Sequence, residues 1–290
     1  MFVEAYKTAT GYTRPIVLVS QKLDTTVATS LGAFVIVNDD GWIATAGHIL
    51  APIANFAGNQ PLIQKYDQDL AAIQSGPGNA KHKRDAIRKL NGSDEWLRFV
   101  VPWFAEDGVQ NAQLHVYPQL DLAVARLAGM TYKPPSYPTF KDPTNLPPGR
   151  SLMRLGYPFH AVELKYDAAT NHIDLDKTNP AYFPIEGIHT RMVTVAPPAL
   201  TTEGFPIKFI ETSSPGLMGQ SGGPLLDTDC NVWGIQSQTS HYELGFGKDA
   251  KDQNAQPIPQ QYLSTGLAVH PEALRAVFAH HNIDAQWSAP

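Results

Sequence analysis

Cysteine and long apolar runs are what this sequence has least of. Cys230 is the only cysteine among 290 residues, so no disulfide can form within the chain. No uninterrupted run of apolar residues comes near the length of about 18 that a transmembrane helix needs. Residues 1–7 also lack the charged start and apolar run of a signal peptide. We therefore expect a soluble, cytoplasmic protein that makes no contact with a membrane.

Charge of one sign and metal-binding patterns are scarce as well. The formal net charge is −5 and no long run of one sign occurs, which argues against a general binder of nucleic acid. The 10 histidines include no helical HxxxH pair, and a second cysteine is absent. We expect neither a metal ion nor another cofactor.

The abundant residues favour short strands. Hydrophobic residues make up 43% of the chain, enough for the core of one large or two small domains, and 22 glycines and 24 prolines interrupt it. β-Rich runs flank the turn Asn38-Asp39-Asp40-Gly41 and predict a hairpin. Further strands are predicted at 15–19, 96–101, 114–117 and 121–127, and then at 151–158, 232–237 and 264–269. A helix is predicted at 271–280, with Pro271 at its first position.

Residues 59–91 and 131–150 differ from the rest. Apolar residues recur at helical spacing in 60–73 and 81–90, which predicts a helical hairpin inserted between strands. Its basic cluster between Lys81 and Lys89 is typical of a solvated helix face, the alternative being a docking surface for a partner. Residues 131–150 are rich in proline, and we interpret them as a linker between two halves.

Three segments carry residues suited to nucleophilic chemistry. Ser221 stands in Gly219-Gln220-Ser221-Gly222-Gly223-Pro224, where glycines permit a turn that exposes the hydroxyl and aims backbone N–H groups at one point. His48 follows small residues at the end of the strand predicted at 42–46. Asp121 begins a mostly apolar strand, where a partly buried carboxylate needs a hydrogen-bonding partner. Taken singly, the glycine-rich segment around Ser221 is also explained as a hairpin loop, and His48 is also explained as a surface histidine.

Taken together and in this order, the segments resemble the motifs of chymotrypsin-like serine proteases. Thr45-Ala46-Gly47-His48 is similar to the histidine motif, with glycine where alanine is usual, and Asp121-Leu122-Ala123-Val124 to the aspartate motif. Residues 219–224 resemble the nucleophile loop, and residues 265–271 resemble the last strand and helix of the bacterial Deg-type (HtrA-like) branch. The resemblance extends across about residues 15–282.

This resemblance implies an all-β fold of two antiparallel six-stranded β-barrels, with the site in the groove between them. The first barrel would occupy residues 1–130, with the helical hairpin inserted at 59–91, and would carry His48 and Asp121. Residues 131–150 would be the linker. The second barrel, with Ser221 and a C-terminal helix, would occupy residues 151–290.

The resemblance also implies a role for each residue. His48 would be the general base, Asp121 the acid that orients it and Ser221 the nucleophile. The backbone N–H groups of Gly219 and Ser221 would form the oxyanion hole, and Ser237 would bond the acid. The substrate-binding walls implied are Pro215, Gly216, Leu217, Met218, Ser237, Gln238, Thr239 and, near the floor, Ser264. No acid falls at that floor, so we expect a small or medium apolar residue before the scissile bond, unless Glu243 folds into the pocket.

The sequence departs from this family in its means of control. Gln220 stands where many secreted members have an acid that pairs with a processed N-terminus, so activation by that ion pair is excluded. The family's disulfides are absent, and we expect no peptide-binding module of the kind that Deg-type proteases carry. We expect that a regulatory protein partner or a signal switches the enzyme, or that it cleaves one dedicated substrate. The insertion at 59–91 is placed to rim the cleft or to bind a regulator.

Two other functions are open beside a serine endopeptidase that acts on proteins or peptides. Esterases of the α/β-hydrolase type also use a Gly-x-Ser-x-Gly turn, but they need strand–helix alternation and the chain order serine, acid, histidine. A catalytically idle protease fold used as a binding module would retain the barrels, but it would have no need of the glycines around Ser221.

Overall fold

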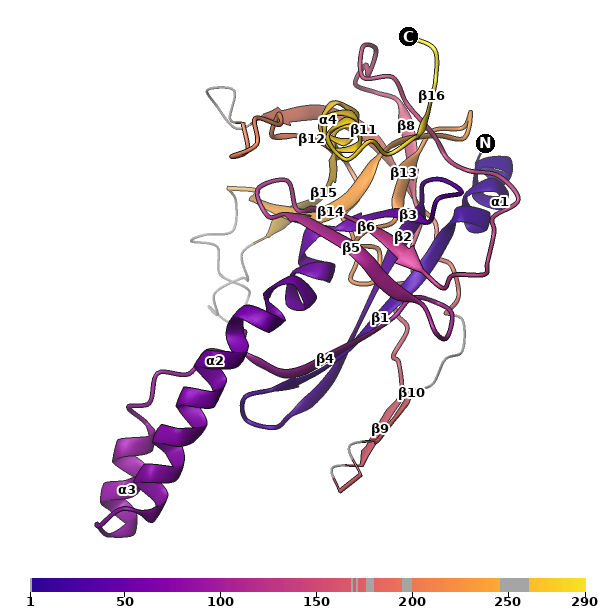
Figure 1. The fold of residues 1–290 in the computed structure, drawn as a ribbon. Coiled ribbons are helices and arrows are strands. Elements are labelled where there is room, and N and C mark those ends of the chain that lie inside the picture. The colour runs from indigo at the N-terminus through magenta and orange to yellow at the C-terminus, as the bar shows by residue number, and fades with distance from the viewer. Residues whose placement is uncertain (1, 168, 171, 176–179, 195–199, 246–260) are drawn as a thin grey trace.

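The computed structural model describes residues 2–167, 169–170, 172–175, 180–194, 200–245 and 261–290. Within these ranges the chain is mostly β, with four helices and two β-lobes (Figure 1). No helix in the described ranges is both long and apolar enough to cross a membrane.

The first lobe is an antiparallel sheet of six strands in the order β4-β1-β2-β3-β6-β5. Its strands are β1 (Thr13–Lys22), β2 (Val27–Ile36), β3 (Trp42–Ala46), β4 (Leu97–Trp103), β5 (Gln110–Tyr117) and β6 (Leu122–Ala128). The predicted hairpin between β2 and β3 is confirmed, because the Asn38 side chain accepts hydrogen bonds from the backbone N–H groups of Asp40 and Trp42. Gly41 takes a φ of +83°, which a residue with a side chain adopts only with strain.

The second lobe contains a closed ring of six strands. They are β8 (Ser151–Arg154), β11 (Ile185–Thr194), β12 (Lys208–Thr212), β13 (Pro224–Leu226), β14 (Asn231–Glu243) and β15 (Tyr262–Val269). Pairing of β13 with β14 joins the two ends of the series β13-β8-β11-β12-β15-β14. The double-barrel fold that the sequence predicted is therefore confirmed. A separate hairpin, β9 (Leu164–Asp167) with β10 (His172–Leu175), projects from this half.

The proline-rich stretch 131–150 contacts both halves of the chain, since Lys133 and Tyr137 bond Asp39 of the first half and a short strand joins the second. Within it, β7 (Thr139–Phe140) pairs in parallel with β14 and with the last strand, β16 (Gln286–Trp287). Phe140 is fully buried and packs edge-on against Phe278, with ring centroids 5.1 Å apart. These residues connect the lobes, and Phe140 belongs to the large hydrophobic core that both lobes share.

The helices differ most from the sequence prediction. α1 (Val3–Tyr12) was not expected; it buries Ala5, Ala9 and Tyr12 against the core. α2 (Gly47–Ser75) begins well before residue 59 and continues directly from β3. The prediction missed this early start because Pro52 and Pro61, which normally break helices, lie inside it. α4 (Pro271–His280) begins and ends as predicted.

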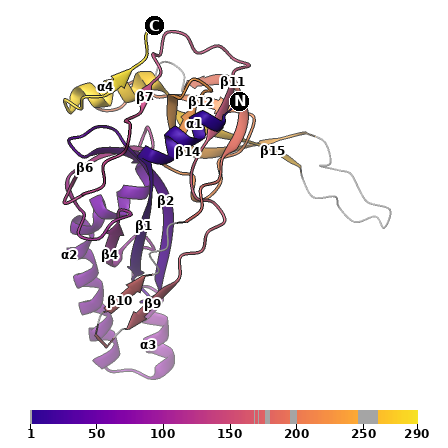
Figure 2. The same ribbon diagram turned by 90° about the vertical axis from the view of Figure 1, so that its right-hand side faces the viewer.

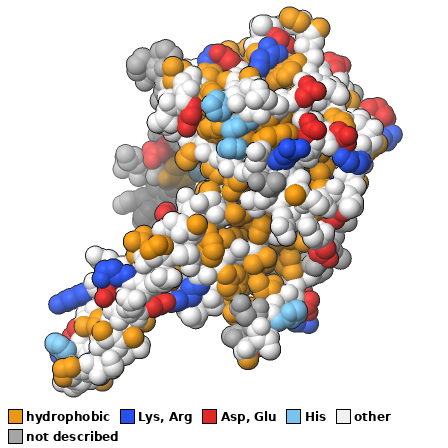
Figure 3. Space-filling model, viewed as in Figure 1, with side chains coloured by type: hydrophobic (Ala, Val, Ile, Leu, Met, Phe, Trp, Pro, Cys, Tyr) orange, Lys and Arg blue, Asp and Glu red, His pale blue; other side chains and the backbone are white. Residues whose placement is uncertain are grey.

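The far part of α2 and α3 (Ala80–Ile87) form an arm that leaves the barrels (Figure 1). α4 lies at the opposite end of the molecule (Figure 2). α3 buries none of its residues, and Lys and Arg side chains stand out on the arm (Figure 3). This agrees with a solvated basic face.

The C-terminal end of α4 packs against the first half of the chain through His281. The His281 ring lies 3.9 Å from the His115 ring, centroid to centroid, and its Nε2 forms a short hydrogen bond with the Tyr117 hydroxyl. These contacts tie α4 of the second half to β5 of the first. Burial lowers the pKa of His281 to about 4, helped by the neighbouring histidines.

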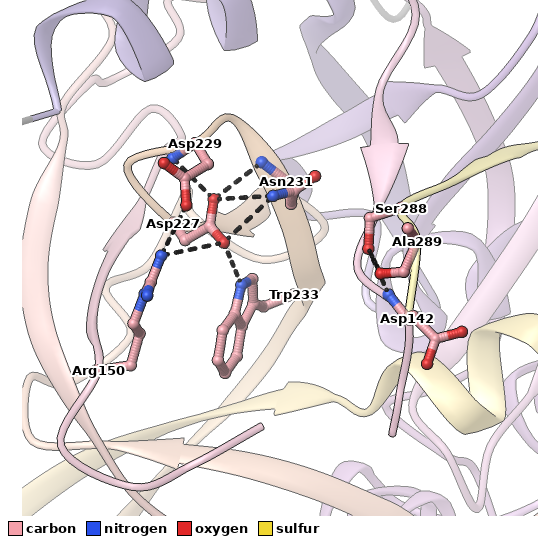
Figure 4. Close-up of polar contacts among 8 residues, drawn as sticks. All are labelled: Asp142, Arg150, Asp227, Asp229, Asn231, Trp233, Ser288 and Ala289. Atoms are coloured by element: carbon pink, nitrogen blue, oxygen red, sulfur yellow. Dashed lines mark hydrogen bonds and ion pairs between the residues drawn. The ribbon is translucent and has the colours of Figure 1, made fainter. Parts of the chain in front are cut away.

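A buried carboxylate holds the turn between β13 and β14 (Figure 4). Asp227 accepts hydrogen bonds from the backbone N–H groups of Asp229 and Asn231 and from the Trp233 indole at 2.8 Å. The Arg150 guanidinium lies 3.8 Å from the same carboxylate. Because β13 starts three residues after Ser221, this turn fixes the strand on which the serine loop rests.

Candidate active site

His48 lies in the first turn of α2, next to Asp121. The chain passes Asp121 so closely at Gly47 that an added Cβ would lie 2.9 Å from the backbone nitrogen of Leu122, which only glycine allows. The backbone N–H of His48 donates to Asp121 Oδ1 at 2.8 Å, and its ring Nδ1 lies 3.0 Å from both carboxylate oxygens. The ring is half-exposed, so its other nitrogen is accessible.

Asp121 is held as an ionised acceptor. It precedes β6 with a φ of +47°, a left-handed conformation that aspartate tolerates better than most residues. Its side chain is 20% exposed and also accepts a hydrogen bond from Ser237 Oγ at 2.7 Å. Burial raises the pKa of Asp121, but the hydrogen bonds from His48 and Ser237 and the charge of His48 outweigh this and leave the pKa below its usual value.

Ser221 is positioned by glycines and by both barrels. The Ser221 carbonyl accepts a hydrogen bond from Ala33 of the first barrel, and the N–H of Gly222 donates to Gln236 of the second, both at 2.8 Å. A side chain at Gly222 would overlap the Ala33 carbonyl and the Thr45 hydroxyl, and its φ is +84°. The loop therefore fits against the first barrel only with glycine after the serine.

Ser237 connects the serine to the acid. Its carbonyl accepts a hydrogen bond of 3.5 Å from Ser221 Oγ, and its own hydroxyl donates to Asp121. The structure thus brings together His48, Asp121 and the pair Ser221 and Ser237, from three regions far apart in the chain. Within the described residues, the hydrogen bond of the Ser221 hydroxyl goes to the Ser237 carbonyl rather than to His48.

The backbone before Ser221 has the geometry of an anion site. The N–H of Gln220 donates to the Leu217 carbonyl at 2.9 Å and closes a turn in which Gly219 has a φ of +91°, as the third position of a type II turn requires. Among the described residues, the N–H groups of Gly219 and Ser221 find no acceptor. Two free N–H groups beside a serine hydroxyl suit an oxyanion.

The predicted substrate walls are placed on two adjoining segments. Thr239 Oγ1 donates to the Gly216 carbonyl at 2.6 Å, which holds the 215–218 segment against β14. Met218 is 92% exposed. Ser264 lies farther along β15, where its hydroxyl bonds His241 at 2.8 Å. Glu243 is the last residue of β14 and is exposed.

Sequence reasoning missed Arg154, the last residue of β8. It is 1% exposed, and a side chain at Gly266 would overlap its guanidinium. The available signal was a single charged residue among the apolar residues of a buried strand.

A cavity of about 330 Å³ borders His48. It is lined by strands of the first barrel, by the start of α2 and by the loop before β4, including Ser20, Ser30, His48, Asn55, Asp94 and Glu95. The first turns of α2, ahead of the insertion predicted at 59–91, therefore border the site. Whether the insertion binds a regulator stays a prediction.

Comparison with known proteins identifies the family. The model of the trypsin-like peptidase domain matches residues 32–235, more than half of the chain and the part that holds His48, Asp121 and Ser221. The chain belongs to the trypsin-like peptidase family. No curated protein sequence matches it.

Among the solved structures similar to this chain are three of proteases with low sequence identity. The HtrA-type protease AlgW with a tripeptide is 17% identical, with 97% of this chain and 64% of AlgW covered and a TM-score of 0.51. A serine-to-alanine variant of AlgW, also with a tripeptide, is 16% identical, with 98% of this chain and 64% of the variant covered and a TM-score of 0.52. The Rv3671c protease from M. tuberculosis in its active form is 12% identical, with 99% of this chain and 86% of that protease covered and a TM-score of 0.49. This trypsin-like peptidase thus spans less than two thirds of the AlgW structures.

Proposed function

We propose that this trypsin-like peptidase is a serine endopeptidase, with Ser221 as nucleophile, His48 as general base and Asp121 as the acid that orients the base. The observation that carries the proposal is the double contact of Asp121 with His48 Nδ1 and with Ser237. A carboxylate that accepts from Nδ1 fixes the imidazole tautomer whose Nε2 has a free lone pair, as a base needs.

The reaction then follows the usual course of acyl transfer. His48 Nε2 takes the proton of the Ser221 hydroxyl as its oxygen attacks the scissile carbonyl, and the N–H groups of Gly219 and Ser221 stabilise the oxyanion. The C–N bond breaks, His48 returns the proton to the leaving amine, and an acyl-enzyme remains. A water molecule, deprotonated by His48, releases the acid and restores Ser221.

The substrate chain has a strand edge on which to bind. β14 pairs with β15 along residues 235–243, whereas β7 and β13 pair only with residues 231–235. At Ser237, Gln238 and Thr239 one edge of β14 is therefore unpaired by any described strand. An extended peptide that adds there in antiparallel fashion would pass Ser221, because Ser237 already contacts it.

Restraint of this protease by a partner, or by a single dedicated substrate, is part of the proposal. Gln220 excludes control through an acid at its position. α2 begins beside His48 and its far part belongs to the exposed arm, so a regulator bound to the arm would be connected to the site by this helix. Casein digestion tests this: rapid degradation of unfolded casein by the purified protein alone would exclude such restraint.

Labelling with a fluorophosphonate probe tests the proposed site. Wild type, Ser221→Ala and His48→Ala are compared with Ser75→Ala and His82→Ala, matched controls on the exposed arm. We expect labelling of wild type and of both controls, and none of the two site variants. Labelling that persists in Ser221→Ala would refute the assignment, and absence of labelling in all proteins, also with cell extract added, would indicate an idle binding module.

A further inference from the structure

A buried cation lies beneath the 214–217 segment, and part of it has no partner. Arg154 Nε donates in a short hydrogen bond to Gln236 Oε1, and Nη1 donates to the carbonyl and hydroxyl oxygens of Ser214 at 2.8 and 2.6 Å. Its third nitrogen, Nη2, is buried and finds no hydrogen-bond partner among the described residues. The guanidinium is thus held by two partners, and the N–H groups of its third nitrogen are left without an acceptor there.

No carboxylate neutralises this charge within the described residues. Burial, with no acid to oppose it, lowers the pKa of Arg154 to about 10. The buried acid Glu211 is paired with Arg191, not with Arg154. An unpaired buried cation is unfavourable for stability, and an unbonded N–H adds to that cost. A feature that weakens the fold in this way suits the binding of an external anion.

The surroundings of Arg154 connect it to the serine. Its partner Gln236 exchanges backbone hydrogen bonds with Gly222 and Gly223, directly after Ser221. Its other partner, Ser214, begins the segment that leads to Gly219. The Gln236 side-chain amide lies so close to Gly216 that an added Cβ there would overlap it. Gly266 leaves room for the guanidinium, because a side chain there would overlap it. The cation therefore lies between the segments that wall the substrate pocket.

We propose that Arg154 selects an acidic side chain, glutamate or aspartate, in the residue that precedes the scissile bond. This inference rests on the proposed endopeptidase function. The substrate carboxylate would accept the N–H of Nη2, while Gln236 and Ser214 keep the guanidinium in place. It replaces the small apolar preference expected from the sequence, which took account of acids at the pocket floor but not of Arg154.

Turnover of matched peptides tests the proposal. Quenched fluorescent peptides that differ only in glutamate, glutamine, alanine or lysine before the scissile bond are compared by kcat/KM. We expect glutamate to exceed glutamine by at least about 100-fold, because a charge-assisted bond to a buried cation is lost with the amide. Arg154→Met should abolish this ratio, whereas Arg191→Met, which removes an exposed arginine, should keep it. Alanine as the best residue would overturn the proposal and show that the guanidinium merely fills the pocket.

Binding to the Ser221→Ala protein keeps this test separate from catalysis. Two product peptides, identical except for C-terminal glutamate or glutamine, are titrated by isothermal calorimetry, which needs neither turnover nor a correct nucleophile. Glutamate bound at least about 10-fold more tightly supports the role of Arg154. Equal affinities would refute it, even where probe labelling has established the protease. The Arg154→Lys variant, which keeps the charge, covers the case in which Arg154→Met fails to fold.

Discussion

Gln220 and Leu217 hold the nucleophile loop by two reciprocal hydrogen bonds. The backbone N–H of Gln220 donates to the Leu217 carbonyl at 2.9 Å, and the Leu217 N–H donates to the Gln220 side-chain oxygen at 3.1 Å. The Gln220 amide nitrogen reaches the Phe183 carbonyl at 3.2 Å. A neutral amide thus braces the anion-binding turn from within, without a charged terminus.

Replacing this amide should weaken both the fold and the site. Gln220→Ala leaves the partly buried N–H of Leu217 without the acceptor that it has now, so we expect a loss of about 1–3 kcal/mol in the free energy of unfolding. Labelling of Ser221 by the fluorophosphonate probe should slow by about 10-fold or more, because the oxyanion donors lose their support. Urea denaturation and the labelling rate measure the two effects. Gln64→Ala, at an exposed position of α2, is the control, and an unchanged labelling rate in Gln220→Ala would contradict this role.

The three site residues should behave as one unit. Ser221→Ala and His48→Ala should each lower kcat by about 10⁶-fold, and the double variant should lose little more. The reason is that the base has no function once the hydroxyl that it deprotonates is gone. Steady-state kinetics on a cleaved peptide measure this. Losses that multiply in the double variant would show that the two residues act independently.

Alanine substitution should change the stability of the protein in opposite directions at two glycines. Gly222→Ala combines a φ of +84° with overlap against Ala33 and Thr45, so we expect destabilisation of about 3 kcal/mol and loss of labelling. Gly58→Ala lies in α2, where an added Cβ meets nothing within 4 Å. It should stabilise the protein by about 0.5–1 kcal/mol, because alanine favours the helix. Thermal and urea unfolding compare the two, and equal effects would be inconsistent with this account.

Stability should fall in mild acid through His270. Its ring caps α4 by accepting the N–H of Glu272 at 3.1 Å, and burial lowers its pKa to about 4, with Lys208 and His189 also opposing its charge. Since the unfolded pKa is about 6.5, the unfolded chain binds the proton first as the pH falls. The contribution of His270 is therefore complete above about pH 6.5 and is lost toward pH 4.

Asparagine at this position separates the cap from the titration. His270→Asn keeps a capping oxygen but cannot be protonated, so its free energy of unfolding should fall about 2 kcal/mol less than that of wild type between pH 7 and 4.5. Urea denaturation at the two pH values measures the difference. Parallel losses in both proteins would assign the acid sensitivity to other groups, of which His281 is one.

Local sequence patterns predict much of the fold. The hairpin around Gly41, the helix that starts at Pro271 and the glycines around Ser221 follow from dihedral preferences and from short-range alternation, which act between residues close in the chain. The motifs of His48, Asp121 and Ser221 also indicate the family by their residues and order alone. The local signals did not predict where α2 begins. Two prolines that would break an isolated helix lie inside it, and tertiary contacts keep the chain helical there.

The contacts that assemble the site join segments distant in sequence. Ser237 lies 116 residues from Asp121, and Arg154 lies 82 residues from Gln236, so no local pattern records either hydrogen bond. The sequence alone indicates the candidate residues of the site and their order, because each motif is a short turn or strand end with its own steric demands. The closure of the barrels decides what those residues touch, since burial leaves each polar group only the partners that packing brings within reach.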